Sequence, residues 1–91
     1  MKPVKTEFKR NGITFRQLKR VGRHAIYELS APEWRNPSYE VVRVRAGRAW
    51  VMGGIEHEAA ETYPTTERWG YDGWSFPTLE DANRRFRLLC K

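Results

Sequence analysis

The chain has very little cysteine and no long apolar run. Its one cysteine, Cys90, stands next to the last residue, so no disulfide framework is available and a cysteine-based zinc site lacks its ligands. No apolar stretch approaches the roughly 20 residues that a membrane-spanning helix needs. The basic N-terminal residues lack the apolar segment of a signal peptide. We therefore expect a cytoplasmic protein with no membrane association.

Motifs for catalysis and metal binding are also missing. HEAAE (57–61) has the first part of the HExxH zinc motif, but Glu61 stands where the second histidine is needed, and His24 is the only other histidine. No glycine-rich elbow presents a serine nucleophile, and the chain has no phosphate-binding loop. We expect no enzymatic activity, no metal and no cofactor. A metal-dependent enzyme built around His57 is kept as a third alternative.

Positive charge is concentrated in the first quarter of the chain. The 91 residues carry 17 Lys and Arg against 11 Asp and Glu, a formal net charge of +6. Residues 1–23 hold eight of the basic residues and one acidic residue, whereas residues 49–91 hold five basic and seven acidic residues. Such an asymmetric field favours association with anions. The alternative is a charged surface that serves solubility alone.

The first half of the sequence is typical of antiparallel strands. Asn11-Gly12 between two short runs predicts a hairpin, because both residues tolerate positive φ. The apolar alternation in 13–21 slips after Phe15, which predicts a β-bulge or a change of buried face. Further turns are expected at 21–24 and 46–48, and a proline-containing loop at 31–38. The strands between them are AIYELS, SYEVVRVRA and AWVMGG.

Residues 55–73 give the weakest pattern, and we expect an irregular connection there. Only EHEAAE is suited to a turn of helix. Trp74-Ser75-Phe76 is expected to form a short additional strand, with Trp74 and Phe76 on one face.

The clearest predicted element is a helix over 79–90. Thr78 is a suitable N-cap, with Asp81 in the capping-box position. Leu79, Ala82, Phe86 and Leu89 follow as one apolar stripe. A lone helix of about twelve residues is marginal in water, so the stripe must pack on the sheet. The predicted fold is α+β, a single domain over 1–91 in which an antiparallel β-meander of three to five strands has the C-terminal helix packed on one face.

The basic residues near strand ends and turns form the candidate binding site. If the 19–23 and 45–48 turns lie at one end of the sheet, their cations are pooled there and are suited to nucleic-acid phosphates. The preferred function is therefore a small non-enzymatic module that binds nucleic acid, and the alternative for these residues is a solvated face that protects strand edges. The candidate residues are Lys19, Arg20, Arg23, Arg43, Arg45 and Arg48.

The second hypothesis is a protein-interaction module. Trp34 lies between two prolines with no strand or helix to pack it, which favours an exposed anchor. In the segment WGYDGWSF (69–76), Trp74 and Phe76 are expected beneath the helix stripe, whereas Trp69 or Tyr71 is expected at the surface. The candidate partner-binding residues are Trp34, Trp69 and Tyr71.

Three segments carry a resemblance to a group of proteins. YEVVRVR (39–45), WGYDGWSF (69–76) and TLEDANRRFRLL (78–89) are together similar to small proteins of phages and other mobile elements. The resemblance covers the second half of the chain and rests on packing residues. It implies an accessory role, either a nucleic-acid contact or inhibition of a host or defence protein, and it transfers no site residue.

Overall fold

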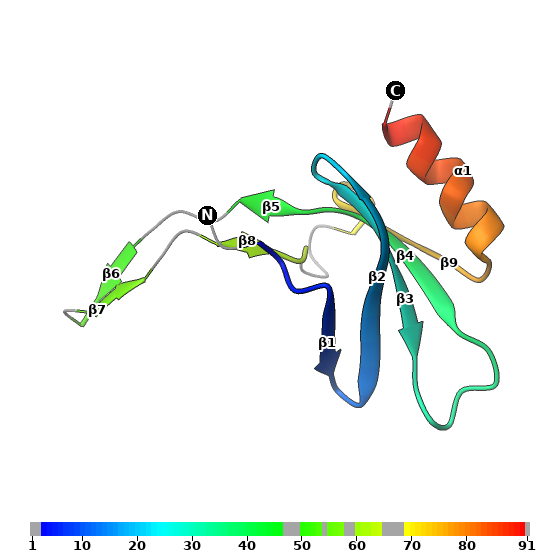
Figure 1. Cartoon of the computed structure of the whole chain (residues 1–91), viewed down its shortest axis with the longest axis horizontal. Coiled ribbons are helices and arrows are strands. Elements are labelled where there is room, and N and C mark those ends of the chain that lie inside the picture. Colours follow the sequence, from blue (N-terminus) through cyan, green and yellow to red (C-terminus); the bar gives the residue numbers. More distant parts are fainter. Residues whose placement is uncertain (1–2, 47–49, 54, 58–59, 65–68, 91) are drawn as a thin grey trace.

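The centre of the structure is a five-stranded antiparallel sheet with a helix on one face (Figure 1). The structure, a computed structural model, describes residues 3–46, 50–53, 55–57, 60–64 and 69–90. Helix α1 (Leu79–Leu89) contacts three neighbouring strands, β3, β4 and β9. The predicted α+β fold is confirmed. The strand order is β1 (Glu7–Arg10), β2 (Ile13–Val21), β3 (His24–Ser30), β4 (Ser38–Arg43) and β9 (Gly73–Phe76).

The local signals in the first hairpins act as predicted. Asn11 and Gly12 have φ of 53° and 78°, the left-handed conformations that a two-residue hairpin turn requires. A β-bulge at Leu18 shifts the pairing of β2 with β3 between Gln17 and Lys19. The bulge explains the slip in the apolar alternation, because one extra residue exchanges the two faces of the strand.

Helix α1 covers the sheet through a small apolar core. The Thr78 hydroxyl caps the helix by accepting a hydrogen bond from the Asp81 N–H at 3.3 Å. Ala82 and Phe86 are buried against Ile26 and Val41, and the side chains packed around this core include Trp74 and Phe76, as predicted. The predicted burial of Leu79 is wrong, since this first-turn residue stays 39% exposed. Among the described residues, no helix has the length and apolar character to cross a membrane.

The opposite face of the sheet has a second core, which is rich in aromatic rings. Tyr63 lies at its centre and meets Phe8, Phe15 and Tyr27 edge-on at centroid distances of 5.6, 5.5 and 5.0 Å. Trp69 also packs against this cluster. In the described part of the chain, α1 therefore covers one face of the sheet over β3, β4 and β9, and the aromatic cluster packs on the other face.

The segment between β4 and β9 contains a projecting hairpin arm (Figure 1). Arg45 lies opposite Thr62 and Trp50 opposite His57, and these two pairings follow one hairpin register. Gly53, with φ of 60°, lies at the tip. The arm comprises β5 (Arg45–Ala46), β6 (Trp50–Met52), β7 (Ile55–His57) and β8 (Glu61–Thr62).

The arm corrects three expectations. AWVMGG is not the next strand of the meander, because β6 pairs with β7 and the place beside β4 is taken by β9. The EHEAAE segment contributes strand residues at His57 and Glu61, not a turn of helix. The expected reversal at 46–48 is wrong at Ala46, which continues a strand paired with Glu61; residues 47 and 48 lie outside the described part.

Candidate nucleic-acid interface

The β2–β3 turn and the start of the arm lie together at one end of the sheet. The Val44 N–H donates to the Arg23 carbonyl at 2.7 Å, and Arg43 pairs with His24 across β3 and β4. This contact brings Arg23, Arg43 and Arg45 close together, as the sequence analysis required. Arg23 and Arg45 are exposed, and no described carboxylate lies within ion-pair distance of either. We call Lys19, Arg23, Arg43 and Arg45 the basic end.

Arg20 is not available to a ligand in the same way. Its guanidinium makes two hydrogen bonds to the Glu61 carboxylate, at 2.7 and 2.6 Å. Glu61 also accepts the Val4 N–H at 3.1 Å. The hydrogen bonds from Arg20 lower the pKa of Glu61 to about 2, and the same contact raises the pKa of Arg20. Arg20 therefore ties β2 to the arm and to the N-terminal segment, and its charge is neutralised.

Lys19 and Arg43 lie on the helix side of the sheet. Lys19 Nζ is 5.4 Å from the centroid of the Phe86 ring, a cation–π contact with α1. Arg43 Nη1 is 3.9 Å from the carboxylate of the buried Asp72, but the Arg43 side chain keeps 47% of its surface exposed. Both cations therefore reach solvent beside the turn.

His24 lies beside the basic end, opposite Arg43, but adds no positive charge at neutral pH. Burial, and then the charge of Arg43, lower the pKa of His24. Its Nε2 atom is buried and has no hydrogen-bond partner in the described part of the chain. The imidazole is therefore neutral near pH 7, and the charge of the basic end rests on lysine and arginine.

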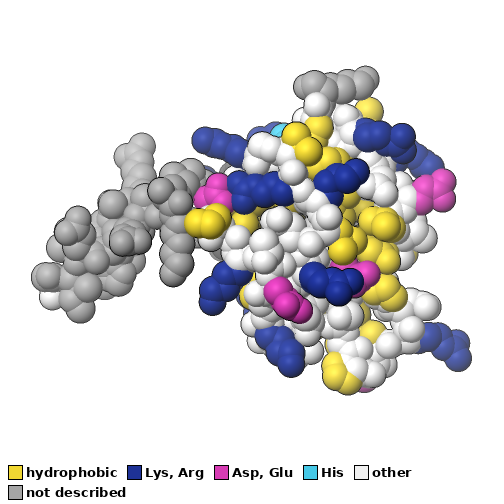
Figure 2. Space-filling model, viewed as in Figure 1, with side chains coloured by type: hydrophobic (Ala, Val, Ile, Leu, Met, Phe, Trp, Pro, Cys, Tyr) yellow, Lys and Arg dark blue, Asp and Glu magenta, His cyan; other side chains and the backbone are white. Residues whose placement is uncertain are grey.

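The structure also limits the predicted basic site. Figure 2 shows Lys and Arg side chains distributed over the visible face, several of them beside acidic side chains. Of the six predicted phosphate-binding residues, four form the basic end, Arg20 is paired with Glu61, and Arg48 lies outside the described residues. The Arg20 pairing was not visible in the sequence, because Glu61 is 41 residues away.

The three predicted partner-binding aromatics do not form one patch. Trp34 is 37% exposed, in a turn closed by its N–H and the Ala31 carbonyl. Tyr71 is 70% exposed and precedes β9, at the other end of the sheet from Trp34. Trp69 is half-buried, and its Nε1 donates to the Ser75 hydroxyl at 3.1 Å. Trp69 thus has a packing role on the face opposite α1.

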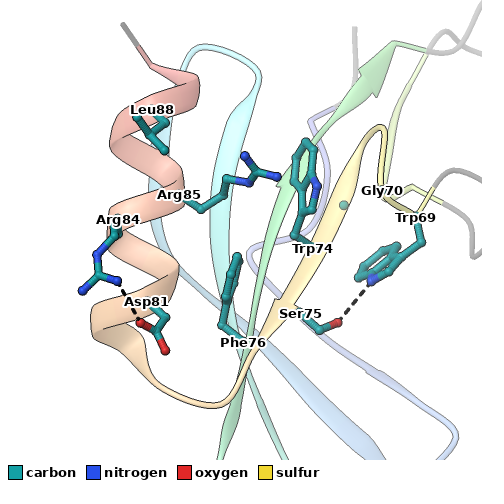
Figure 3. Close-up of a pocket in the computed structure, with 10 residues that line it drawn as sticks. Trp69, Gly70, Trp74, Ser75, Phe76, Asp81, Arg84, Arg85 and Leu88 are labelled. Atoms are coloured by element: carbon teal, nitrogen blue, oxygen red, sulfur yellow. Dashed lines mark hydrogen bonds and ion pairs between the residues drawn. The ribbon is translucent and has the colours of Figure 1, made fainter.

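A groove that the sequence analysis missed lies between α1 and β9 (Figure 3). Its cavity volume is about 780 Å³. One signal was present in the sequence: helix residues at 81, 84, 85 and 88 share one face. This face lies beside the apolar stripe of Ala82 and Phe86, which alone predicts the packing of the helix on the sheet. The lining includes Trp74, Phe76, Asp81, Arg84, Arg85 and Leu88.

The HEAAE segment does not provide a metal centre of the HExxH kind. His57 belongs to strand β7 and Glu61 to strand β8, whereas the HExxH motif requires these two positions on one helix. Among the described residues, no group of three or more His, Cys, Asp or Glu is placed to hold a metal ion.

Comparison of the chain with protein-family models, with curated proteins and with solved structures finds no match. The similarity to phage and mobile-element proteins therefore stays a prediction from the sequence.

Proposed function

We propose that this protein is a small non-enzymatic module that binds nucleic acid through phosphate contacts at the basic end. The observation that carries the proposal is the main-chain hydrogen bond from Val44 to Arg23, which joins the β2–β3 turn to the start of the arm, where Arg23 and Arg45 are both exposed. Lys19 and Arg43 extend this positive region on the helix side. Phosphate contacts carry no sequence information themselves, so we expect binding with little sequence preference.

The salt dependence of binding tests the proposal. A protein that neutralises four phosphates of duplex DNA is expected to lose roughly 100-fold in affinity between about 50 and 200 mM salt. Fluorescence anisotropy with a labelled duplex and a labelled single strand measures this loss. The variant Arg23→Ala/Arg45→Ala should bind more weakly and reduce the slope of log K against log salt by about two on duplex DNA.

A matched control removes the same charge from the other end of the sheet. Arg10 precedes the β1–β2 turn and Arg35 lies in the β3–β4 loop, and both are exposed. Arg10→Ala/Arg35→Ala lowers the net charge equally but leaves the basic end intact, so the salt slope should change little. Equal losses in the two double variants, or no binding of any oligonucleotide at low salt, would contradict the proposal.

A second candidate function is a protein-interaction module, as expected of an inhibitor from a phage or mobile element. The observation that favours it is the exposure of Trp34 and Tyr71, since large exposed aromatic side chains are enriched among interface hot spots. A pull-down that survives nuclease treatment and is lost in Trp34→Ala supports this function. A complex retained by both Trp34→Ala and Tyr71→Ala would show that neither residue is the anchor.

A further inference from the structure

Strand β9 is an outer strand of the sheet, and part of its main chain faces away from β4. The Arg43 N–H donates to the Asp72 carbonyl at 2.6 Å. Because hydrogen-bonding positions alternate along an antiparallel strand, Trp74 and Phe76 also turn their main-chain groups to β4, while Gly73 and Ser75 turn theirs outward. The Gly73 carbonyl accepts the Gly70 N–H at 2.8 Å. Within the described part of the chain, Trp69 bridges the edge at Gly73 and no strand pairs with the outward N–H and C=O of Ser75, so this stretch of β9 is a template for another strand.

The groove described above runs beside this open edge. Trp74 and Phe76 contribute apolar surface from β9, and Leu88, which is 55% exposed, contributes it from α1. The Arg85 guanidinium lies over the Trp74 indole, 4.7 Å from the ring centroid (Figure 3). This contact restrains the side chain while its N–H groups, which lie in the guanidinium plane, stay available as donors.

The two neighbouring arginines of the groove differ in their partners. Arg84 lies 3.8 Å from the Glu80 carboxylate and 3.5 Å from that of Asp81. Arg85 has no carboxylate within ion-pair distance among the described residues. Among the described residues, the groove therefore offers the Arg85 guanidinium, restrained by Trp74 and without a carboxylate partner, beside the strand edge and apolar surface.

We propose that the α1–β9 groove binds an extended peptide segment of a partner protein, which adds to the edge of β9 and places an Asp or Glu side chain on Arg85. Strand addition uses the main-chain groups of Ser75 for affinity, and the alternate side chains of the peptide enter the groove. We infer an acidic side chain at Arg85 from charge complementarity, because a planar guanidinium binds a carboxylate through two parallel hydrogen bonds. This site is separate from the basic end.

Other occupants fit the groove less well. A nucleic-acid base needs an open aromatic face, but Trp74 is covered by Arg85, and Trp69 is packed against Gly73. Antiparallel pairing of two β9 strands places both α1 helices on one face of the joined sheet, so the Arg84–Arg85 surfaces of the two copies meet. Like charges at that junction disfavour a second copy.

The experiment selects the probe from a phage-displayed library of random linear peptides, with the full chain immobilised. Enriched peptides, made synthetically, are expected to carry Asp or Glu and to bind the protein in fluorescence anisotropy. Arg85→Glu should weaken their affinity by about tenfold or more, because a charge-assisted hydrogen bond is replaced by repulsion. The control is Arg87→Glu, which makes the same charge change at an exposed position outside the groove lining.

Two further measurements separate strand addition from charge attraction alone. Saturation with peptide should slow hydrogen exchange of the Ser75 N–H by about tenfold or more, because strand addition protects that group. Replacing the peptide carboxylate by its amide should cost about tenfold on the wild-type chain and little on Arg85→Gln. This double-mutant cycle of peptide and protein also tests the contact with Arg85 if the Arg85→Glu variant does not fold.

Several results would overturn the proposal. They are the absence of any enriched peptide, equal binding by Arg85→Glu and Arg87→Glu, and unchanged exchange at Ser75. Protection of Ser75 by a twelve-nucleotide single strand would assign the groove to nucleic acid. Protection that rises with protein concentration, together with dimers in sedimentation equilibrium, would assign it to a second copy.

Discussion

The six-membered ring of the Trp69 indole occupies the space that a side chain at Gly73 would fill. A Cβ built on Gly73 would lie 2.5 Å from Trp69 Cζ3 and 2.6 Å from Cε3. The same indole donates a hydrogen bond to Ser75, two residues further along β9. Glycine is required at this position by close packing, and the WGYDG segment folds back so that its first residue covers its last.

Gly73→Ala is therefore expected to destabilise the fold. The new methyl group displaces the indole and breaks its hydrogen bond to Ser75, at a cost of about 1–3 kcal/mol in the free energy of unfolding. Urea denaturation followed by tryptophan fluorescence measures the change. In the Trp69→Ala background the same substitution should cost much less, because the clash is gone. Additive effects of the two substitutions would show that the packing does not decide the choice of glycine.

The Arg20–Glu61 pair predicts a loss of stability in acid. The pKa of Glu61 falls from 4.5 to about 2 in the folded protein. A carboxyl group with a lowered folded pKa contributes stability above its unfolded pKa and loses that contribution as the pH falls toward the folded value. The free energy of unfolding should therefore decrease between about pH 4.5 and pH 2. Urea titrations across this range measure it.

Glu61→Gln should remove most of that pH dependence and lower stability at pH 7 by about 1–3 kcal/mol, because the Arg20 guanidinium loses its charged partner. Glu28→Gln is the matched control. Glu28 forms an exposed ion pair with Arg16, with 3.3 Å between Arg16 Nη2 and Glu28 Oε1. Such a pair contributes little to the free energy of unfolding. If both variants kept the acid dependence of the wild type, the pair would not be its source.

Tyr63 and Glu40 form a second pH-sensitive contact. The Tyr63 hydroxyl donates to the Glu40 carboxylate at 2.5 Å. Burial raises the pKa of Glu40, and the hydrogen bond from Tyr63 limits that rise. Tyr63→Phe should cost about 1–3 kcal/mol at pH 7, because a partly buried carboxylate loses its donor.

The cost of Tyr63→Phe should shrink as the pH falls and Glu40 takes up a proton. A raised folded pKa means that the folded state holds this proton more tightly than the unfolded state, so protonation favours folding. The test is the difference in free energy of unfolding between wild type and variant at pH 7 and pH 4.5. A difference that stays constant with pH would contradict the role of the carboxylate.

Arg20 and Arg23 are three residues apart but are expected to differ in function. Arg20→Ala leaves the Glu61 carboxylate without its guanidinium and should lower stability more than it lowers oligonucleotide affinity. Arg23→Ala should lower affinity at low salt and leave the urea midpoint nearly unchanged, since the Arg23 side chain is exposed. Parallel urea and anisotropy measurements on both variants separate the two roles. If Arg23→Ala lowered stability and left the oligonucleotide affinity unchanged, Arg23 would not be a phosphate-binding residue.

Local sequence signals predicted much of the sheet and helix. The Asn11-Gly12 turn, the slip in β2 and the Thr78 cap each depend on residues within one or two turns of chain. The Gly53-Gly54 pair, at the end of the expected strand AWVMGG and with apolar residues on both sides, is a hairpin signal of the same kind. A two-residue glycine turn flanked by strands is sufficient to predict the β6–β7 pairing.

The candidate site was predicted only in part, because its residues meet through distant contacts. The sequence shows which basic residues are close to one another along the chain. It does not show which carboxylate forms an ion pair with each of them. Glu61 reaches Arg20 across 41 positions, and Trp74 meets Arg85 only because α1 folds back over β9. Neither contact leaves a periodic signal in the sequence.

What the sequence determined by itself was the type of each element and the charge carried by the chain. Backbone preferences, helix capping and apolar alternation act between residues that are close in the sequence, so one sequence is sufficient to recognise them. The tertiary structure decided which arginine is paired with Glu61, which strand lies at the edge beside α1, and that each face of the sheet carries its own core. Those outcomes depend on contacts between residues far apart in the sequence. Such contacts form only in the folded chain, where each charge and each apolar side chain has several possible partners.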